Sequence, residues 1–214
     1  MTMSAPLWSP SDDRRASANL TRFMEHVCVC CGFEANGDYF ALHRWAIDNP
    51  EAFWDAVWNF SEVVCPEKGD VVLEDGDRFP GARWFPQARL NFAANLLRYR
   101  DERPALVSLL ENGSRRELSF AELYTRVARL AAALRAEGVV AGDRVAGFMP
   151  NVEETVVAML AATSIGAVWS SCSPDFGING VMDRFGPVSY THLRAHETND
   201  LISYGVFCVE KGGG

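Results

Sequence analysis

Small hydroxyl side chains, an acid and an aromatic ring gather in one short stretch, residues 169–177, which reads WSSCSPDFG. The simpler interpretation is structural: a strand ends in a tight turn whose backbone is set by Pro174 and Gly177, and Asp175 binds nearby N–H groups. The functional interpretation is a ligand site, because serines at a strand end leave room for a ligand and Phe176 offers a flat apolar wall. Residue types and spacing alone slightly favour the structural interpretation.

Other residues that could do chemistry have ordinary structural explanations. Glu153 and Glu154 resemble a catalytic carboxylate pair, but adjacent helix positions point about 100° apart. We therefore expect them to complement the positive end of a helix dipole. His192 and His196 have the i, i+4 spacing of a metal-binding helix face, and we set them aside because of the segment that contains them, described below.

Familiar motifs for nucleotide, dinucleotide and nucleophilic chemistry do not occur in the sequence: it contains no P-loop, no G-x-G-x-x-G and no G-x-S-x-G. The six cysteines include no paired C-x-x-C ligand motifs, so we expect reduced thiols. They are Cys28, Cys30 and Cys31 in one short segment, and the scattered Cys65, Cys172 and Cys208. We name no catalytic residue and expect no metal site.

The elements that would position these residues begin with a helical region. Residues 11–60 predict three helices rich in Trp and Phe. In the third, Asn49 is expected to be the N-cap and Pro50 the first helical residue. One stripe of this helix must be buried, and it consists of Phe53, Trp54, Val57 and Trp58. Residues 66–86 are polar and rich in Gly, which indicates a long surface connection, and a short helix is expected over residues 90–98.

The pattern then changes to a hairpin followed by a helix. Residues 105–110 form an apolar run, and the Asn112-Gly113 dipeptide predicts a tight turn to a second strand. Ser119 and Glu122 have the spacing of a capping box at the start of a helix. One apolar face of that helix is marked by Leu123, Val127, Leu130 and Leu134, and Gly138 ends it.

Two further strands complete the expected architecture. Residues 144–148 form a strand, Asn151 is expected to cap the next helix, and residues 167–171 form another strand. Strands that alternate with helices imply parallel pairing, so we expect an α/β fold with a doubly wound, mostly parallel sheet. Such sheets bind ligands beyond the carboxyl ends of their strands, which places residues 149–151 and 170–177 at the functional rim.

Composition and charge exclude several classes of partner. Twenty Lys and Arg against 28 Asp and Glu give a net charge of −8, so we expect no binding to nucleic acid or to an anionic membrane. The longest largely apolar run, Val156 to Trp169, is shorter than the roughly 20 residues that span a bilayer. No secretory signal or transit peptide is visible at the N-terminus, so we expect a cytoplasmic protein.

Four strings resemble the AMP-forming acyl-CoA synthetases of the adenylate-forming superfamily. They are SANLTRFM at 17–24, WFPQARLNFAANLL at 84–97, GDRVAGFMPN at 142–151 and WSSCSPDFG at 169–177. Within this family the SSCSPDFG turn is similar to that of the ligases that act on acetoacetate, and acetate-activating members carry a different turn. The resemblance extends from residue 1 to about residue 186, the opening part of the family's chain.

The resemblance implies an N-terminal synthetase region over residues 1–98 and an incomplete AMP-binding domain over residues 99–187. It implies that acetoacetate and ATP react to form an acyl-adenylate and diphosphate, after which CoA displaces AMP. ATP with Mg²⁺ and CoA are therefore the expected cosubstrates. The family's turn lies near the pantetheine channel, which implies that Phe176 lines the CoA path. The family's phosphate loop and late lysine do not occur in this sequence, so we expect this chain to be inactive by itself.

The last residues depart from the family. Residues 188–214 are expected to be non-native, since VSYTHLRAHET resembles the translation of a library adapter, and the two histidines within them then carry no functional message. A parallel sheet that stops at this point is expected to leave a strand edge unpaired and to favour aggregation.

Two other functions stay open. The chain could derive from a ligase for another short acid, such as acetate or propionate, because the acid-binding residues of the family lie further along its chain. It could also be a short, non-catalytic interaction module that uses its Trp-rich helices as a docking surface.

Overall fold

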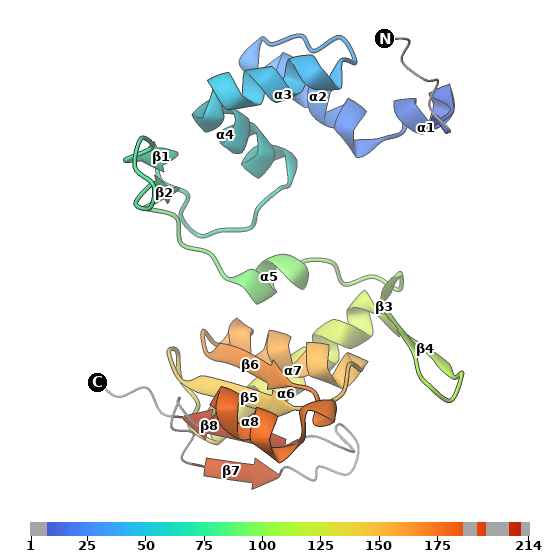
Figure 1. Ribbon diagram of the computed structural model, residues 1–214, viewed down its shortest axis with the longest axis vertical. Coiled ribbons are helices and arrows are strands. Elements are labelled where there is room, and N and C mark those ends of the chain that lie inside the picture. Colours follow the sequence, from blue (N-terminus) through green and yellow to red (C-terminus); the bar gives the residue numbers. More distant parts are fainter. Residues whose placement is uncertain (1–7, 186–191, 196–205, 211–214) are drawn as a thin grey trace. The chain divides into compact units, whose positions relative to one another are not determined.

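The computed structural model describes residues 8–185, 192–195 and 206–210, and the chain divides into two compact units, Met1–Arg89 and Leu90–Gly214 (Figure 1). The first unit is mainly helical. The second unit combines helices with short strands, and it contains the expected rim.

The helical unit has four helices over residues 11–60 where the sequence predicted three: α1 (Asp12–Ala16), α2 (Asn19–Cys31), α3 (Tyr39–Asp48) and α4 (Pro50–Phe60). The extra boundary is at Ser17, whose N–H donates to the carbonyls of Asp13 and Arg15 and so ends α1. Gly32 ends α2 in the left-handed conformation, with φ of 67°, which glycine adopts at little cost.

Aromatic side chains build the core of this unit. The ring of Phe23 on α2 contacts Phe53 and Phe60 on α4 edge to face, with ring centroids 5.9 and 5.2 Å apart. Phe33 stacks on Trp45 at 5.1 Å. Such pairs stabilise a core beyond the area that they bury. The aromatic composition of the sequence therefore supports a core of its own in this unit.

The start of α4 is predicted correctly in position but not in its hydrogen bonds. Asn49 is the N-cap residue and Pro50 the first helical residue, yet the Asn49 side chain makes no cap bond. Its amide Nδ2 instead donates to the Trp45 carbonyl at the end of α3, 3.0 Å away. The predicted buried stripe is also only partly buried, since Trp54 is exposed and only Ala56 of α4 is fully buried.

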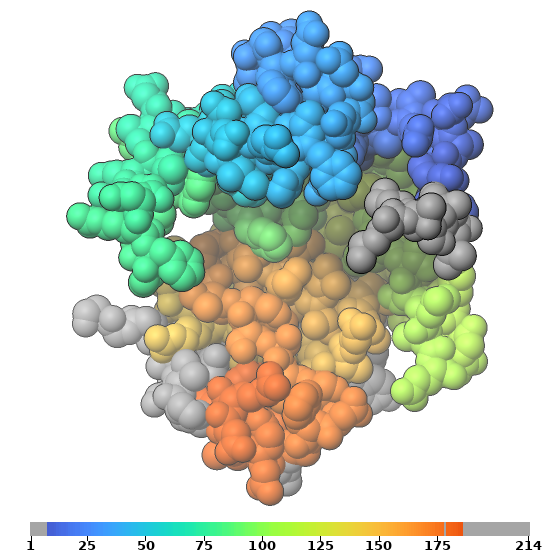
Figure 2. Space-filling view, turned by 45° about the horizontal axis from the view of Figure 1, so that its top comes forward, coloured from blue at the N-terminus to red at the C-terminus, as the bar shows by residue number. Residues whose placement is uncertain are grey.

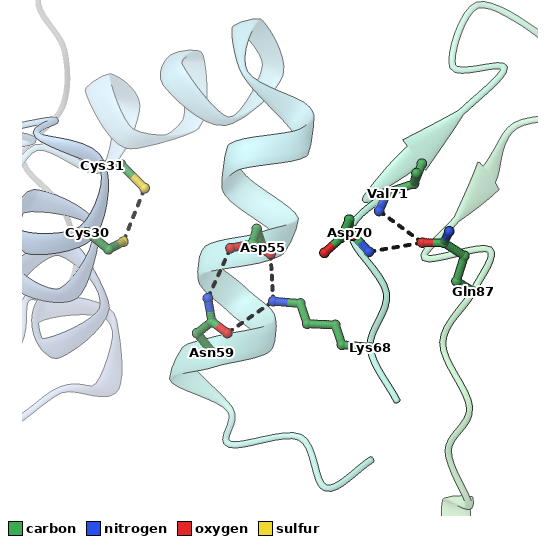
Figure 3. Close-up of polar contacts among 8 residues, drawn as sticks. All are labelled: Cys30, Cys31, Asp55, Asn59, Lys68, Asp70, Val71 and Gln87. Carbon is green, nitrogen blue, oxygen red and sulfur yellow. Dashed lines mark hydrogen bonds and ion pairs between the residues drawn. The ribbon is translucent and has the colours of Figure 1, made fainter. Parts of the chain in front are cut away.

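The connection after α4 is more ordered than predicted. It contains a two-stranded antiparallel sheet of β1 (Leu73–Glu74) and β2 (Arg83–Trp84). Lys68 ties the connection to α4, because its Nζ lies 2.6 Å from Asp55 Oδ1 and donates to Asn59 Oδ1 at 3.1 Å (Figure 3). Gln87 Oε1 accepts hydrogen bonds from the N–H groups of Asp70 and Val71.

The second unit begins with α5 (Phe92–Leu96) and the predicted hairpin of β3 (Pro104–Leu109) and β4 (Arg115–Ser119). Its turn contains Gly113 with φ of 78°, as the Asn-Gly signal requires. The predicted capping box at the start of α6 (Phe120–Ala136) is confirmed, with both the Ser119 and the Glu122 hydrogen bond present.

A four-stranded sheet follows, with the strand order β6-β5-β8-β7 (Figure 1). Its members are β5 (Arg144–Phe148), β6 (Val168–Cys172), β7 (His192–Ala195) and β8 (Val206–Glu210). The helix α7 (Glu153–Ser164) connects β5 to β6, and η1 (Pro174–Phe176) and α8 (Gly177–Phe185) follow β6. The predicted strand at 144–148 is confirmed.

The expected doubly wound parallel sheet is only partly present, and this corrects the predicted fold class. The fold is α/β, but β3 pairs with β4 in a separate antiparallel sheet and does not join β5. Among the described strands only β5 and β6 pair in parallel, while β8 pairs with β5 antiparallel. A short turn lets β3 find its hydrogen-bond partner locally, so the alternation of strand and helix overstates the parallel sheet. In this order β5 is paired on both sides, while β6 and β7 each have one strand neighbour.

Helices cover both faces of β5. Val145 lies in a core with α6 and α7, and the next residue, Ala146, lies in a second core with Cys172 and Phe185 of α8. This alternation follows from the two-residue period of a strand. The helix α7 is rich in buried alanines, which allows other elements to approach it closely.

Asn91 connects the start of α5 to the end of α7. Its Oδ1 accepts a hydrogen bond from the Ala94 N–H and so caps α5, while its Nδ2 donates to the carbonyls of Thr163 and Ser164 at the end of α7. One side chain therefore satisfies groups at two helix ends. Within the described part of the chain, no helix is both long enough and apolar enough to cross a membrane.

Candidate functional site

The rim that the sequence predicted lies where β5 and β6 end side by side. The two strands run parallel with Phe148 opposite Cys172, and the Met149 N–H donates to the Cys172 carbonyl at 3.1 Å. The segments 149–151 and 170–177 therefore lie next to each other where Met149 meets Cys172, as the carboxyl ends of parallel strands require.

A glycine lets a large ring lie across this sheet. A Cβ atom on Gly147 of β5 would lie 2.5 Å from Cη2 of Trp169 on β6, which is closer than atoms of ordinary side chains approach. The half-buried Trp169 packs against the core that α6 and α7 form. The first residue of the WSSCSPDFG string thus faces the core and supports the strand that carries the turn.

The turn after β6 is held by Ser173. Its Oγ accepts a hydrogen bond from the Asp175 N–H at 3.3 Å and donates to Asp175 Oδ2 at 2.8 Å. The hydroxyl therefore caps η1, and Asp175 is its partner through both backbone and carboxylate. Gly177 has φ of 62°, so the chain turns sharply from η1 into α8. The structural interpretation of these residues is confirmed, except that Ser173 supplies the acceptor expected of Asp175.

Phe176 is half exposed at this turn, with 52% of its surface accessible. The guanidinium carbon of Arg184 on α8 lies 4.5 Å from the centre of its ring. Gly180 makes room for the ring, because a Cβ there would lie 2.8 Å from Cβ of Phe176. The side chain is thus held by α8 while part of the ring stays accessible. Figure 2 shows that η1 and α8, in orange, lie at the surface of their unit.

Arg184 was not identified from the sequence. It lies eight positions after Phe176, and the intervening turn and helix bring the two together, so no helical or strand period marks the pair. A cation over an aromatic face contributes roughly 0.5–1 kcal/mol at an exposed position. The arrangement offers a ligand an apolar ring and a positive charge at one place.

The predicted cap of α7 is wrong. The N-cap residue is Val152, not Asn151, and it makes no side-chain cap bond. Other groups accept the free N–H groups at this end of the helix: the Val152 carbonyl accepts from the Thr155 N–H at 3.1 Å, and the carboxylate of Glu153 accepts a hydrogen bond from its own N–H. Local alternatives of this kind remove the need for an asparagine cap.

The two glutamates of α7 pair with an arginine from the hairpin. Arg116 Nη1 on β4 lies 3.3 Å from Glu153 Oε1 and 3.6 Å from Glu154 Oε1, and only 7% of the Glu153 side chain is exposed. Burial alone would raise the pKa of Glu153, but hydrogen bonds from Ser108, from its own N–H and from Arg116 outweigh it and lower the pKa. The pair therefore stays ionised and holds the hairpin to α7.

This chemistry does not amount to a catalytic centre among the described residues. No three His, Cys, Asp or Glu side chains converge on a metal position there. His192 and His196, the i, i+4 pair that we set aside, do not form a helix face at the first residue, because His192 lies on β7, and His196 lies outside the described residues. What the rim can offer is a binding surface formed by Phe176 and Arg184.

Comparison with known proteins covers both units. Residues 39–96 match the family model described as acetyl-coenzyme A synthetase N-terminus, and residues 92–185 match the model described as AMP-binding enzyme. The second match ends at the last residue of α8.

Two relatives and one solved structure are similar to this chain, and all three are synthetases of the same name. The chain is 46% identical to acetoacetyl-coenzyme A synthetase of Rhizobium meliloti (strain 1021) over 88% of this chain and 29% of that protein. It is 40% identical to acetoacetyl-CoA synthetase of Rattus norvegicus over 85% of this chain and 27% of that protein. The structure of acetoacetyl-CoA synthetase from Streptomyces lividans superposes with a TM-score of 0.80 and 45% identity, over 86% of this chain and 29% of that one.

The chain thus spans less than a third of the length of the relatives that it matches. The residues that match include the rim at the ends of β5 and β6, which lies within 92–185. The resemblance predicted from the four sequence strings is confirmed. The chain is a homologue of the N-terminal part of acetoacetyl-CoA synthetases and carries a segment of the AMP-binding enzyme family.

Proposed function

We propose that this chain forms the opening part of a ligase that makes acetoacetyl-CoA, AMP and diphosphate from acetoacetate, ATP and CoA. The observation that carries the proposal is the 46% identity to an acetoacetyl-coenzyme A synthetase over 88% of the chain. The 0.80 TM-score with a second such synthetase supports it, because the likeness extends to the fold.

The proposed roles follow from the two units. The helical unit is structural, since five of its aromatic side chains build its own core: Phe23, Phe33, Trp45, Phe53 and Phe60. The second unit supplies the rim at β5 and β6, and there the exposed face of Phe176 lines the path of CoA. Arg184 fits this role, because a guanidinium can pair with a phosphate of CoA. In this proposal ATP with Mg²⁺ binds through groups that the family carries further along its chain.

The chain by itself does not catalyse the reaction in this proposal, because transition-state stabilisation needs groups that handle the nucleotide. The test joins residues 1–185 to the remaining length of the Streptomyces lividans synthetase and measures acetoacetate-dependent release of diphosphate. We expect the chimera to be active and the 214-residue chain to be inactive. Turnover by the isolated chain, or a well-folded chimera without activity, would contradict the proposal.

Acetate is the second candidate substrate, favoured by the match of residues 39–96 to the acetyl-coenzyme A synthetase N-terminus. The two relatives described above match both units and are named for acetoacetyl-CoA, and we therefore place acetate second. The acid is tested on the protein expressed from the uninterrupted reading frame. A preference for acetate or propionate over acetoacetate in kcat/KM would reverse the order.

We also propose that residues 188–214 are not native to the ligase. The family match ends at residue 185, and the described strands of this tail, β7 and β8, pair antiparallel in a sheet whose family strands are parallel. Reading the source DNA across codon 187 tests the proposal. A genomic frame that continues intact into the tail would contradict it.

A further inference from the structure

Three cysteines crowd the last turn of α2, and two of their sulfur atoms are in contact. Cys30 and Cys31 are exposed, and their Sγ atoms lie 3.1 Å apart (Figure 3). Cys28 lies on the same turn and is half buried. No part of the proposed ligase reaction uses these thiols.

Helix geometry prevents this pair from closing into a relaxed disulfide. Consecutive Cα atoms are about 3.8 Å apart across a trans peptide. A disulfide usually needs Cα atoms about 4.4–6.8 Å apart. Cys28 and Cys31, three positions apart on the helix, have Cβ atoms about 5–6 Å apart, which is more than a disulfide bridges. The thiols therefore remain reduced while α2 stays helical.

The surroundings keep the Cys31 thiol protonated at neutral pH. Partial desolvation by neighbouring atoms, followed by the hydrogen bond and charge of Cys30 and the charge of Asp55 on α4, raises the pKa of Cys31 to about 11. A thiol with such a pKa is a weak nucleophile at neutral pH, which disfavours attack on a disulfide or a peroxide. It does not disfavour a ligand that takes up two thiols together and releases their protons as water.

We propose that Cys30 and Cys31 form a two-thiol chelating site for a monosubstituted trivalent arsenical. Arsenic(III) is soft, bonds to sulfur and holds two sulfur ligands close together on one pyramidal atom, which suits sulfurs already in contact. Both As–O bonds of the arsenical oxide break, two As–S bonds form, and the two thiol protons leave with the oxygen as one water. Arsenic and sulfur keep their oxidation states.

The preformed pair explains why the site needs both sulfurs. Once one sulfur has bonded to arsenic, the second is held next to it at high effective concentration. Removing either sulfur leaves a single, easily exchanged As–S bond. Removing Cys28 leaves the chelating pair intact, so Cys28→Ser is the matched control.

Phenylarsine oxide is the probe, and binding to the full chain is measured by intact mass spectrometry and by competition with 2-mercaptoethanol. We expect one phenylarsine group per chain that resists the monothiol and is removed by the dithiol 2,3-dimercaptopropanol. Cys30→Ser and Cys31→Ser each lower the resistance to monothiol at least tenfold, and Cys28→Ser does not. Far-UV circular dichroism checks that every variant keeps its helices.

Two results would overturn the site. One is retention of the phenylarsine group by a folded Cys30→Ser or Cys31→Ser variant at the level of the unmodified chain. The other is a loss in Cys28→Ser as large as in the other two variants, which would assign the ligand to a different pair. If diamide forms a Cys30–Cys31 disulfide while the helix content stays unchanged, the inference that helix geometry prevents this disulfide is wrong.

Discussion

Single side chains in this protein join elements that are far apart in the sequence, and Arg116 is the clearest case. It pairs with Glu153 across 37 positions, and the sequence gives no sign of the pair. The two glutamates were expected only to complement the dipole of α7. Spacing can predict partners within a helix turn, as it did for Ser119 and Glu122, but not partners that only the fold brings together.

Glu153→Gln tests this ion pair. The pKa of Glu153 is lowered in the folded chain, so its contribution to stability is present above the ordinary value of 4.5 and is lost as the pH falls through the folded value. We expect the variant to lose about 1–3 kcal/mol of unfolding free energy at pH 7. The difference from the unmodified chain should shrink below pH 4.5, measured by urea unfolding at several pH values.

Glu154→Gln is the matched control for this experiment. Glu154 lies further from Arg116, at 3.6 Å, and its side chain is more exposed. We expect a smaller loss of stability, because a solvated pair contributes little. Equal losses in the two variants would show that the pairing with the buried Glu153 is not what stabilises this region.

Phe176 is tested in the active chimera. Phe176→Ala removes the ring that lines the proposed CoA path, and we expect the KM for CoA to rise about tenfold, or about 1.4 kcal/mol. Acetoacetate-dependent diphosphate exchange, which needs no CoA, should change little. Phe176→Tyr keeps the ring and should behave like the unmodified chimera. A normal KM for CoA in a folded Phe176→Ala variant would remove Phe176 from the path.

At the scale of elements, the sequence predicted what local chemistry decides. The hairpin at Asn112-Gly113, the helix α6 and the strand β5 are all confirmed. The two boundaries that were wrong, at Ser17 and at Asn151, depend on which of several nearby groups takes a free N–H or carbonyl. Many residues can fill that role, so a residue type alone does not identify the cap.

Asn91 connects two elements and can be dissected. Asn91→Ala loses both the cap of α5 and the two hydrogen bonds to the end of α7, and we expect it to lower the unfolding free energy by about 2–3 kcal/mol. Asn91→Asp keeps the acceptor for the Ala94 N–H but loses the donor to Thr163 and Ser164. The difference between the two variants in thermal unfolding separates the contribution of the α5 cap from that of the hydrogen bonds to the end of α7. If neither variant is destabilised, water replaces both the cap of α5 and the hydrogen bonds to the end of α7.

At the scale of the whole molecule, the fold class was predicted only in part. The alternation of strands and helices correctly indicated an α/β unit, but it could not show that the predicted hairpin of β3 and β4 would form a sheet separate from β5. Which strands become neighbours depends on contacts between distant residues. The rim at β5 and β6 was predictable because it needs only one parallel pair, and that pair is present.

The division into two units predicts that a substitution in the core of one unit destabilises that unit and leaves the other unchanged. Val27 and Val127 are both almost fully buried, one in each unit. We expect Val27→Ala and Val127→Ala each to cost about 2 kcal/mol. Hydrogen exchange followed by mass spectrometry should show faster exchange in α2 and α4 for the first variant, and in α6 and α7 for the second. Faster exchange across both units in either variant would show that they unfold together.

The hairpin of β3 and β4 has a practical consequence. Its tip at Asn112 and Gly113 is exposed, its base at Ser119 runs directly into α6, and Arg116 near the turn pairs with α7. Loop tips of this kind accept inserted chain. An epitope spliced between these two residues should be captured by its antibody without lowering the melting temperature by more than about 2 °C. The tip would then serve as a built-in handle for immobilising the protein and for following the joined ligase in a cell extract.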